Sequence, residues 1–251
     1  MTETEDRTAG FIDWYQGGVL ADRYLETILA DWKGTGLLLL QAPILAALAV
    51  LVWQNVGQST PSLYFVMVLS NLWIGCMDAC REIVKERPLF LREKMVNLNV
   101  ASYLYSKVRV LALLDCVQVV TYSLIVFKWV SVDVPIGWLI VTLLFTAFCG
   151  TCLGLVLSSF VKRSDYAVGL VPLVIIPQIL FSEFAIKADQ FSGVSKIIYD
   201  LMPARWGYEA LVEFAKTDGS ALIGAADTFP LLVFSAVFLA VAYPILRVQR
   251  Y

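Results

Sequence analysis

The residue types available for chemistry are restricted, because the 251 residues of this chain include no histidine. Serine–histidine catalysis, cysteine–histidine catalysis and histidine-ligated metal sites are therefore excluded within the sequence. No G-x-x-x-x-G-K-[ST] segment that would cradle nucleotide phosphates occurs either. Cys149 and Cys152 are three residues apart and cannot complete a tetrahedral zinc site alone. We expect these thiols to pack in a core, and we expect no metal, no cofactor and no enzymatic activity in this chain.

Charge concentrates in one interior segment, residues 81–107, which reads REIVKERPLFLREKMVNLNVASYLYSK. Both charge signs alternate there with regularly placed apolar residues. Ile83, Phe90 and Met95 would anchor a helix against the rest of the chain. The charged side chains would then face water or a partner: Glu86, Arg87, Arg92, Glu93 and Lys94. A charged helix tied to two neighbouring spans can pass a partner's movement to them, and a solvated basic loop that only fixes topology is the alternative.

A single carboxylate, Asp115, interrupts the apolar stretch LALLDCVQ. A carboxylate within a membrane span is costly and usually finds a partner in the protein interior or along an aqueous path. Arg81 and Gln118 are the candidate partners, so Arg81 and Asp115 form a candidate polar relay. A buried structural pair, a role in conformational coupling and a proton relay all remain open for this residue.

These residues must be positioned by membrane-spanning helices. Hydrophobic residues make up 59% of the chain and charged residues 16%, and the mean hydropathy is +0.73. Soluble domains carry about 45–50% apolar and about 25% charged residues. A span needs roughly 20 apolar residues. We therefore expect an all-α polytopic membrane protein with six transmembrane helices, at about 37–53, 62–80, 110–127, 136–159, 166–183 and 229–246.

The segments around these spans differ in character. Residues 1–19 are expected to form a disordered acidic tail. In residues 20–33, LADRYLETILADWK, apolar and aromatic positions recur every four residues. This pattern predicts an amphipathic helix in the membrane interface, and an ordinary packed soluble helix is the alternative. Residues 184–228 are expected to be an external loop, and residues 20–251 a single transmembrane domain.

The distribution of Lys and Arg predicts the orientation. If the N-terminus is cytoplasmic, 14 of the 19 basic residues lie on that side and five on the other. This bias agrees with the positive-inside rule. We expect both termini in the cytoplasm, an even number of spans and a location in the plasma (inner) membrane.

Small residues and prolines mark two of the predicted spans. Gly150, Gly154 and Ser158 are spaced four apart, a pattern that lets helix backbones approach closely. Pro172 and Pro177 interrupt the fifth span, either as plain kinks or as part of a cavity wall.

Two stretches carry a resemblance to a known family. The run Glu86–Glu93, ERPLFLRE, is followed by Ala101-Ser102-Tyr103 and Ser106-Lys107. It resembles the segment after the second span in type-2 ABC transporter membrane domains of the G subfamily, which includes the white and pleiotropic-drug-resistance transporters. Residues 202–210, MPARWGYEA, resemble the Pro-Arg-aromatic-Gly stretch of that family's large external loop. The amphipathic helix before the first span also fits.

The resemblance implies roles for particular segments. Residues 82–95 would be a cytoplasmic coupling helix docked on a nucleotide-binding domain, and residues 20–33 the connecting helix. The implied coupling residues are Glu82, Lys85, Glu86, Arg87, Phe90, Arg92 and Glu93. Of these, the glutamates 86 and 93 would pair with basic groups in the membrane domain or on the ATPase. Asn71, with Ile74 one turn on, would line a central substrate cavity, for which Pro172 and Pro177 are further candidates.

The sequence departs from the family at two places. Arg81 stands where many relatives carry an acidic residue, which puts the polar relay in doubt. The expected external loop also lacks the cysteines that many eukaryotic members use for disulfides.

The leading functional expectation is a permease subunit of an ATP-driven ABC exporter that moves a hydrophobic or amphipathic compound, such as a lipid or glycolipid, outward. Its expected partners are an ATPase subunit or domain that binds ATP and Mg²⁺, a second copy of the permease, and membrane lipid, with no nucleic acid. One alternative is a membrane scaffold or sensor whose charged loop binds a regulatory partner. Another is a proton-coupled carrier that depends on Asp115.

Overall fold

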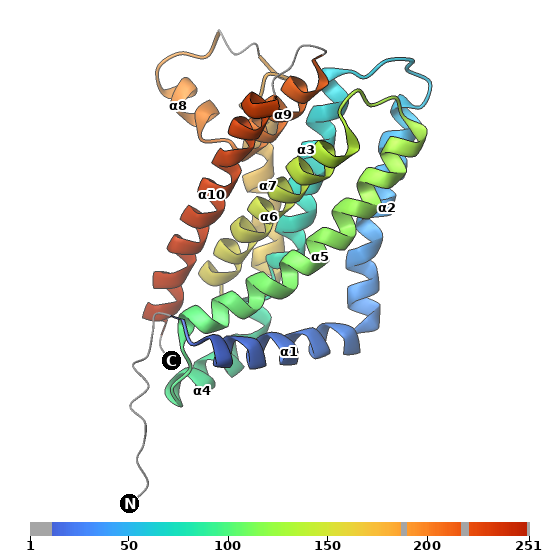
Figure 1. The fold of residues 1–251 in the computed structure, drawn as a ribbon. Coiled ribbons are helices and arrows are strands. Elements are labelled where there is room, and N and C mark those ends of the chain that lie inside the picture. Colours follow the sequence, from blue (N-terminus) through green and yellow to red (C-terminus); the bar gives the residue numbers. More distant parts are fainter. Residues whose placement is uncertain (1–11, 187–189, 217–220, 250–251) are drawn as a thin grey trace, which may run out of the picture.

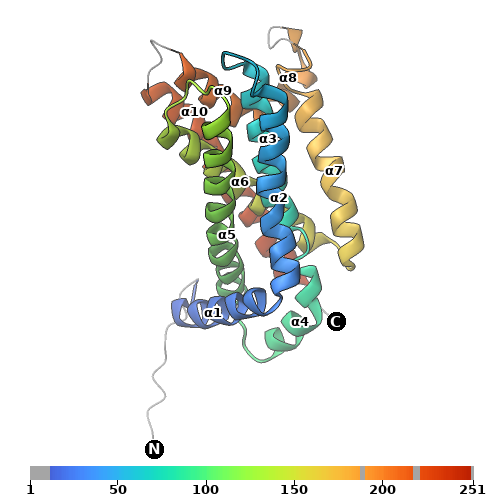
Figure 2. The same ribbon diagram turned by 90° about the vertical axis from the view of Figure 1, so that its right-hand side faces the viewer.

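The computed structural model describes residues 12–186, 190–216 and 221–249, without the side chains of residues 221 and 222. All regular elements in these ranges are helices, as predicted. Long helices run side by side, and one helix lies across their foot (Figures 1 and 2). The elements are α1 (Trp14–Ala30), α2 (Trp32–Trp53), α3 (Pro61–Ala79), the 3₁₀ turn η1 (Val84–Glu86), α4 (Arg87–Met95), α5 (Val100–Trp129), α6 (Ile136–Phe160), α7 (Ser164–Leu180), α8 (Val194–Asp200), α9 (Pro203–Ala215) and α10 (Ala221–Val248).

Five helical stretches of the described chain are long and apolar enough to cross a membrane: Trp32–Trp53, Pro61–Met95, Val100–Trp129, Ile136–Phe160 and Ile223–Val248. The apolar helix α7 runs beside them but has only 17 residues. Helices α1 and α4 lie at one end of the bundle, called here the α1/α4 end. Helices α8 and α9 lie at the other, the α8/α9 end.

The N-terminal helix differs from its predicted bounds. Asp13 caps α1 by accepting a hydrogen bond from the Gln16 amide at 3.0 Å, so the helix already begins at Trp14. Residues 14–19, predicted as tail, are therefore helical, while residues 1–11 lie outside the described part. The predicted helix 20–33 also ends early, because the Asp31 side chain accepts from the Gly34 amide and starts α2 as a new helix.

The centre of the bundle is the contact between α3 and α6. A Cβ atom built on Gly150 would overlap the carbonyl oxygen of Leu72, and one on Gly75 would overlap the carbonyl oxygen of Ala147. Only glycine lets the two backbones come this close. The predicted small-residue pattern on α6 is thus confirmed as a helix-packing feature, and its partner is α3.

The α8/α9 end is more ordered than the predicted loop 184–228, since it contains α8, α9 and the start of α10. Arg205, in the second family-like stretch, pairs with Glu209 at 2.7 Å and also with Asp200. The Ala204 amide donates to Gln178 Oε1 at 3.1 Å, which ties α9 to α7. Proline at the first turn of α9 suits this start, because its missing amide needs no partner there.

We expect Gly150→Ala to lower the free energy of unfolding by about 1–3 kcal/mol, because the added methyl group must push α3 and α6 apart. The matched control is Gly169→Ala on α7, where a Cβ meets open space. The control should be neutral or stabilising by up to about 1 kcal/mol, since alanine favours helix over glycine. Unfolding of the purified protein in detergent measures both, and equal stability of the two variants would contradict the close contact.

Candidate functional site

The charged segment between α3 and α5 folds back against the α1/α4 end. The predicted helix 82–95 is divided into the turn η1 and helix α4, with Pro88 in the first turn of α4. Ile83 and Phe90 are buried as predicted, and the Phe90 ring lies 4.7 Å from the ring of Tyr103 on α5. Met95 is 68% exposed, so it does not anchor the helix as expected. The two buried anchors lie earlier in the segment, whereas Met95 is the last residue of α4.

The start of the segment is fixed to the end of α6. The Ser158 hydroxyl accepts hydrogen bonds from the amides of Ile83 and Val84, both at 3.0 Å. Arg87 donates to the carbonyl oxygen of Val161 at 2.9 Å. Arg87 was expected to face water or a partner. Instead it hydrogen-bonds a carbonyl at the end of α6 that has no partner within the helix.

A buried ion pair joins the segment to α5. Lys107 Nζ lies 2.6 Å from Glu86 Oε2, and the lysine side chain is only 1% exposed while that of Glu86 is 19% exposed. The ammonium also lies 3.4 Å from the ring centroid of Tyr24, a cation–π contact that links α1 to the same point. Glu86 therefore serves as the counter-ion of Lys107, a basic group of the membrane domain as the resemblance implied, and does not project freely into water.

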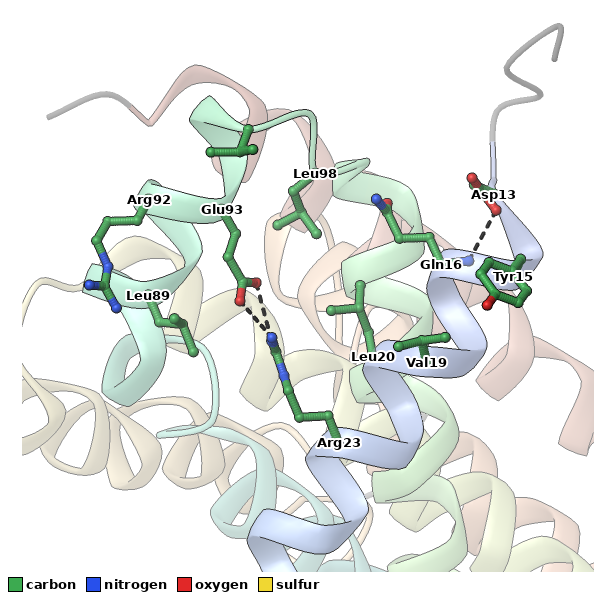
Figure 3. A pocket seen from close by; sticks show the side chains of 11 residues that line it. Asp13, Tyr15, Gln16, Val19, Leu20, Arg23, Leu89, Arg92, Glu93 and Leu98 are labelled. Atoms are coloured by element: carbon green, nitrogen blue, oxygen red, sulfur yellow. Dashed lines mark hydrogen bonds and ion pairs between the residues drawn. The ribbon is translucent and has the colours of Figure 1, made fainter. Parts of the chain in front are cut away.

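Helix α1 is tied to the segment by two further carboxylates. Both Nη atoms of Arg23 donate to Glu93, at 2.5 and 3.1 Å (Figure 3). The Tyr24 hydroxyl donates to Glu82, which also accepts from Lys85 at 2.7 Å. Burial and the neighbouring Glu82 carboxylate raise the pKa of Tyr24 well above its usual value, so its phenol remains a donor.

The end of α4 holds the end of α10. Lys94 Nζ donates to the carbonyl oxygens of Leu246, Arg247 and Gln249, at 3.0, 2.7 and 2.9 Å. An ammonium at a helix C-terminus satisfies orphan carbonyls and opposes the negative end of the helix dipole. The Gln249 side chain continues the chain of contacts by donating to the Ser159 carbonyl of α6 at 2.7 Å. Nothing in the sequence pattern pointed to this contact, because the partners are 152–155 residues apart.

Between α1 and α4 lies a surface cavity of about 670 Å³, called here the α1/α4 groove. Its apolar lining includes Val19 and Leu20 from α1 and Leu89 from α4, and the charged residues around it include Arg92 (Figure 3). Arg92 is exposed and has no ion pair in the described part of the chain. The groove thus combines an apolar floor with a free cation.

The predicted substrate-cavity residues separate into two groups. Asn71 and Ile74 are fully buried inside the bundle, and Asn71 donates to the Met67 carbonyl of its own helix at 2.8 Å. Pro172 lines a second cavity, of about 300 Å³, and Pro177 does not. This cavity lies between α2, α3 and α7 and is lined by Leu45, Val66, Leu69, Ser70, Trp73, Pro172, Ile175, Ile176 and Ile179. The cavity is therefore lined by the face of α3 that carries Ser70 and Trp73, not by the face that carries Asn71. The i, i+3, i+4, i+7 spacing that begins at Val66 groups these lining residues on one face of the helix.

The predicted relay between Arg81 and Asp115 is not formed. Asp115 is fully buried and accepts from the Thr151 hydroxyl, at 3.0 and 2.8 Å to its two oxygens. Arg81 is exposed at the end of α3, and Gln118 donates instead to the Leu38 carbonyl at 2.9 Å. Sequence reasoning missed the partner because Thr151 lies 36 residues later, on the next helix, α6.

We expect Glu86→Gln to destabilise the protein more than Lys107→Met does. Glu86→Gln leaves a buried ammonium without its counter-ion, which costs about 3–5 kcal/mol in comparable sites. Lys107→Met leaves a partly exposed carboxylate that water can reach. Denaturant unfolding in detergent measures both, and the double variant should recover stability relative to Glu86→Gln alone. A larger loss in Lys107→Met would contradict the assigned burial.

We expect Lys94→Met to loosen the last turn of α10. Three charge-assisted hydrogen bonds disappear, so the local opening free energy should fall by at least about 1.4 kcal/mol, a factor of ten in amide exchange. Hydrogen–deuterium exchange over residues 245–248 measures the change. Lys33→Met, which removes a charge at the same end of the bundle, is the control and should leave this turn unchanged. Equal exchange in both variants would show that the contact carries no stability.

Comparison with known proteins identifies the family of the chain. Residues 15–214 match the ABC-2 type transporter family. The chain is also 30% identical over 221 residues to the ABC transporter ATP-binding/permease protein Rv1747 of Mycobacterium tuberculosis (strain ATCC 25618 / H37Rv). That alignment covers 78% of this chain and 25% of the relative, so the chain spans about a quarter of that protein's length. Because the family match extends over most of the chain, this protein belongs to the ABC-2 type transporter family and is a membrane-spanning component of an ABC transporter.

Proposed function

We propose that this chain is the permease subunit of an ATP-driven exporter, and that an ATPase carrying ATP and Mg²⁺ docks at the α1/α4 end. The observation that carries the proposal is the set of contacts around η1 and α4. The segment is joined through side chains to α1, α5, α6 and α10. A force applied to α4 therefore reaches four helices at once.

The α1/α4 groove supplies the docking surface of this proposal. Val96 and Tyr15, which line it, are 82% and 76% exposed, so apolar surface remains uncovered there. Arg92 offers a cation that no carboxylate among the described residues neutralises. A partner helix with an apolar stripe and one acidic residue would match both features. In this proposal Arg92 and Leu89 contact the ATPase, whereas Glu86, Arg87 and Glu93 hold the segment in place within the permease.

In this proposal the α1/α4 end faces the cytoplasm of a cell with the protein in its plasma (inner) membrane. The 17 residues of α7 extend roughly 25 Å at 1.5 Å per residue, so α7 serves as a short sixth span. Six spans then return both termini to the cytoplasm. Lys and Arg favour this orientation. Three of the residues in that charge count, Arg7, Lys187 and Arg250, lie outside the described part of the chain.

The transport path is assigned to the cavity between α2, α3 and α7. Its lining is apolar apart from Ser70 and the indole nitrogen of Trp73, which suits a hydrophobic or amphipathic substrate such as a lipid or glycolipid. The neighbouring faces of α2 and α7 are also apolar and exposed, with Ile44 of α2 at 49% and Leu173 of α7 at 66%. A second copy of the chain, facing the first across these helices, would enclose the path in a homodimer.

The docking test is copurification with an ATPase that contains a Walker motif and is encoded beside or fused to a relative of this permease. We expect Arg92→Glu to reduce the copurified ATPase at least about tenfold, an effect of about 1.4 kcal/mol. The matched control is Lys162→Glu, an exposed charge reversal at the same end of the bundle but outside the groove. Equal loss in both variants, or in neither, would refute the assigned groove.

The transport test uses proteoliposomes of the permease–ATPase complex containing a fluorescent phospholipid as the probe. With ATP on the α1/α4 side, the probe should collect in the opposite leaflet, and Trp73→Ala should slow it more than Trp129→Ala. Movement that needs only a pH gradient, and that Asp115→Asn abolishes, would favour the carrier alternative. Binding of a kinase or scaffold in place of an ATPase would favour the sensor alternative.

A further inference from the structure

A second cavity at the α1/α4 end lies in the elbow where the flat helix α1 meets the upright helix α2 (Figure 2). Its volume is about 480 Å³, within the usual range for small-molecule sites. It is separate from the α1/α4 groove, since the two share no lining residue. Polar side chains from the ends of α1 and α3 line one part, and apolar side chains of α2 and α5 line the other.

The three carboxylates that line this cavity already have donors. Glu82 accepts from Tyr24 and Lys85. Asp78 accepts from Gln41 at 2.6 Å, and Asp31 caps α2 through the Gly34 amide at 3.2 Å. Lys85 is likewise engaged by Glu82. Glu82 and Lys85 therefore form an ion pair within the chain, whereas Asp31 and Asp78 accept only from neutral donors, and Asp78 Oδ2 is buried without a partner in the described residues.

Arg81 is the exception among the charged lining residues. It is exposed, and within the described ranges its side chain makes neither a hydrogen bond nor an ion pair. Its planar guanidinium presents paired N–H donors that fit a phosphate. Ser164 lines the same cavity and begins α7, whose first turn has no side-chain cap. Asp165 lies in that first turn but does not line the cavity.

The other part of the cavity is formed by Ile28, Leu37, Leu38, Leu111 and Leu114. Leu37 is 69% exposed, so this wall continues onto the outer surface of α2, a candidate membrane-spanning helix. A ligand that satisfies both parts carries one anionic group at the membrane interface and an apolar chain directed into the hydrocarbon. The lining holds three carboxylates and two cations, so the attraction for an anionic headgroup rests on the unpaired guanidinium of Arg81.

We propose that the elbow cavity binds an anionic phospholipid from the leaflet at the α1/α4 end. Arg81 and Ser164 hold the phosphodiester, and one acyl chain lies along Leu38 and Leu114. The bound lipid would fill the space between α1, α2, α3 and α5 and so brace the helix that carries Arg23 and Tyr24. The proposal does not depend on an ATPase or on transport, so it can fail or succeed independently of the proposed exporter function.

The test is native mass spectrometry of the purified chain in detergent, with phosphatidylglycerol or phosphatidylcholine added. Wild-type protein should retain phosphatidylglycerol in preference to phosphatidylcholine. Arg81→Gln should lower retained phosphatidylglycerol at least about fivefold, an effect of about 1 kcal/mol. The control, Lys33→Gln, removes an equal charge from an exposed position at the same interface that does not line the cavity, and should change retention less than twofold.

A second variant and a soluble competitor keep the result decisive. Leu114→Trp fills the apolar wall without changing charge and should also reduce retention. Glycerol 3-phosphate, which has the headgroup phosphate but no chains, should fail to displace the lipid at millimolar concentration. Equal retention of the two lipids, wild-type retention in Arg81→Gln, or displacement by glycerol 3-phosphate would each overturn the proposal.

Discussion

The burial of the Lys107 ammonium is the constraint on which the α1/α4 end depends. A cation this deeply buried must find a counter-ion and further electrostatic support, because desolvation alone would cost several kcal/mol. Glu86 supplies the charge and Tyr24 supplies the face of its ring. These two residues come from η1 and α1, so the lysine can be satisfied only when both elements sit against α5. One desolvated charge thereby fixes the relative position of three segments.

The contact between α3 and α6 gives this arrangement something rigid to act on. Backbones that touch through Gly75 and Gly150 leave no side chains between them to rearrange. The end of α6 binds the start of η1 through Ser158, and the end of α3 leads directly into it. When α4 is displaced, α3 and α6 therefore keep their positions relative to each other and move together.

Hydrophobicity was enough to locate the membrane helices, because an apolar run of sufficient length has few other solutions. The expected stretch 136–159 corresponds closely to Ile136–Phe160. The direction in which single residues point was not predictable in the same way. Apolar residues lie on every side of α3, so the spacing that groups Val66 with Ser70 does not tell whether that face or the face of Asn71 lines a cavity. The hydrogen-bond partners of Asp115 and Arg87 were not predicted either. These partners, Thr151 and Val161, lie on or just after α6, and sequence spacing does not show which helices pack against each other. The contacts of Glu93 with Arg23 and of Lys94 with α10 likewise required the tertiary structure.

The contacts between helices indicate which parts of the bundle move together. Helices α5, α6 and α10 are each joined to η1 or α4 by an ion pair or hydrogen bond, and α3 is packed directly on α6. Helix α7 meets the rest chiefly through apolar side chains, with the Gln178–Ala204 hydrogen bond at its far end. Apolar contacts are non-directional and can slide, whereas charge-assisted hydrogen bonds hold one geometry. A push on α4 should then shift α3, α5, α6 and α10 as one body relative to α7. The cavity beside Trp73 and Pro172 lies on that boundary, where a change in the relative position of the two parts would alter its shape most.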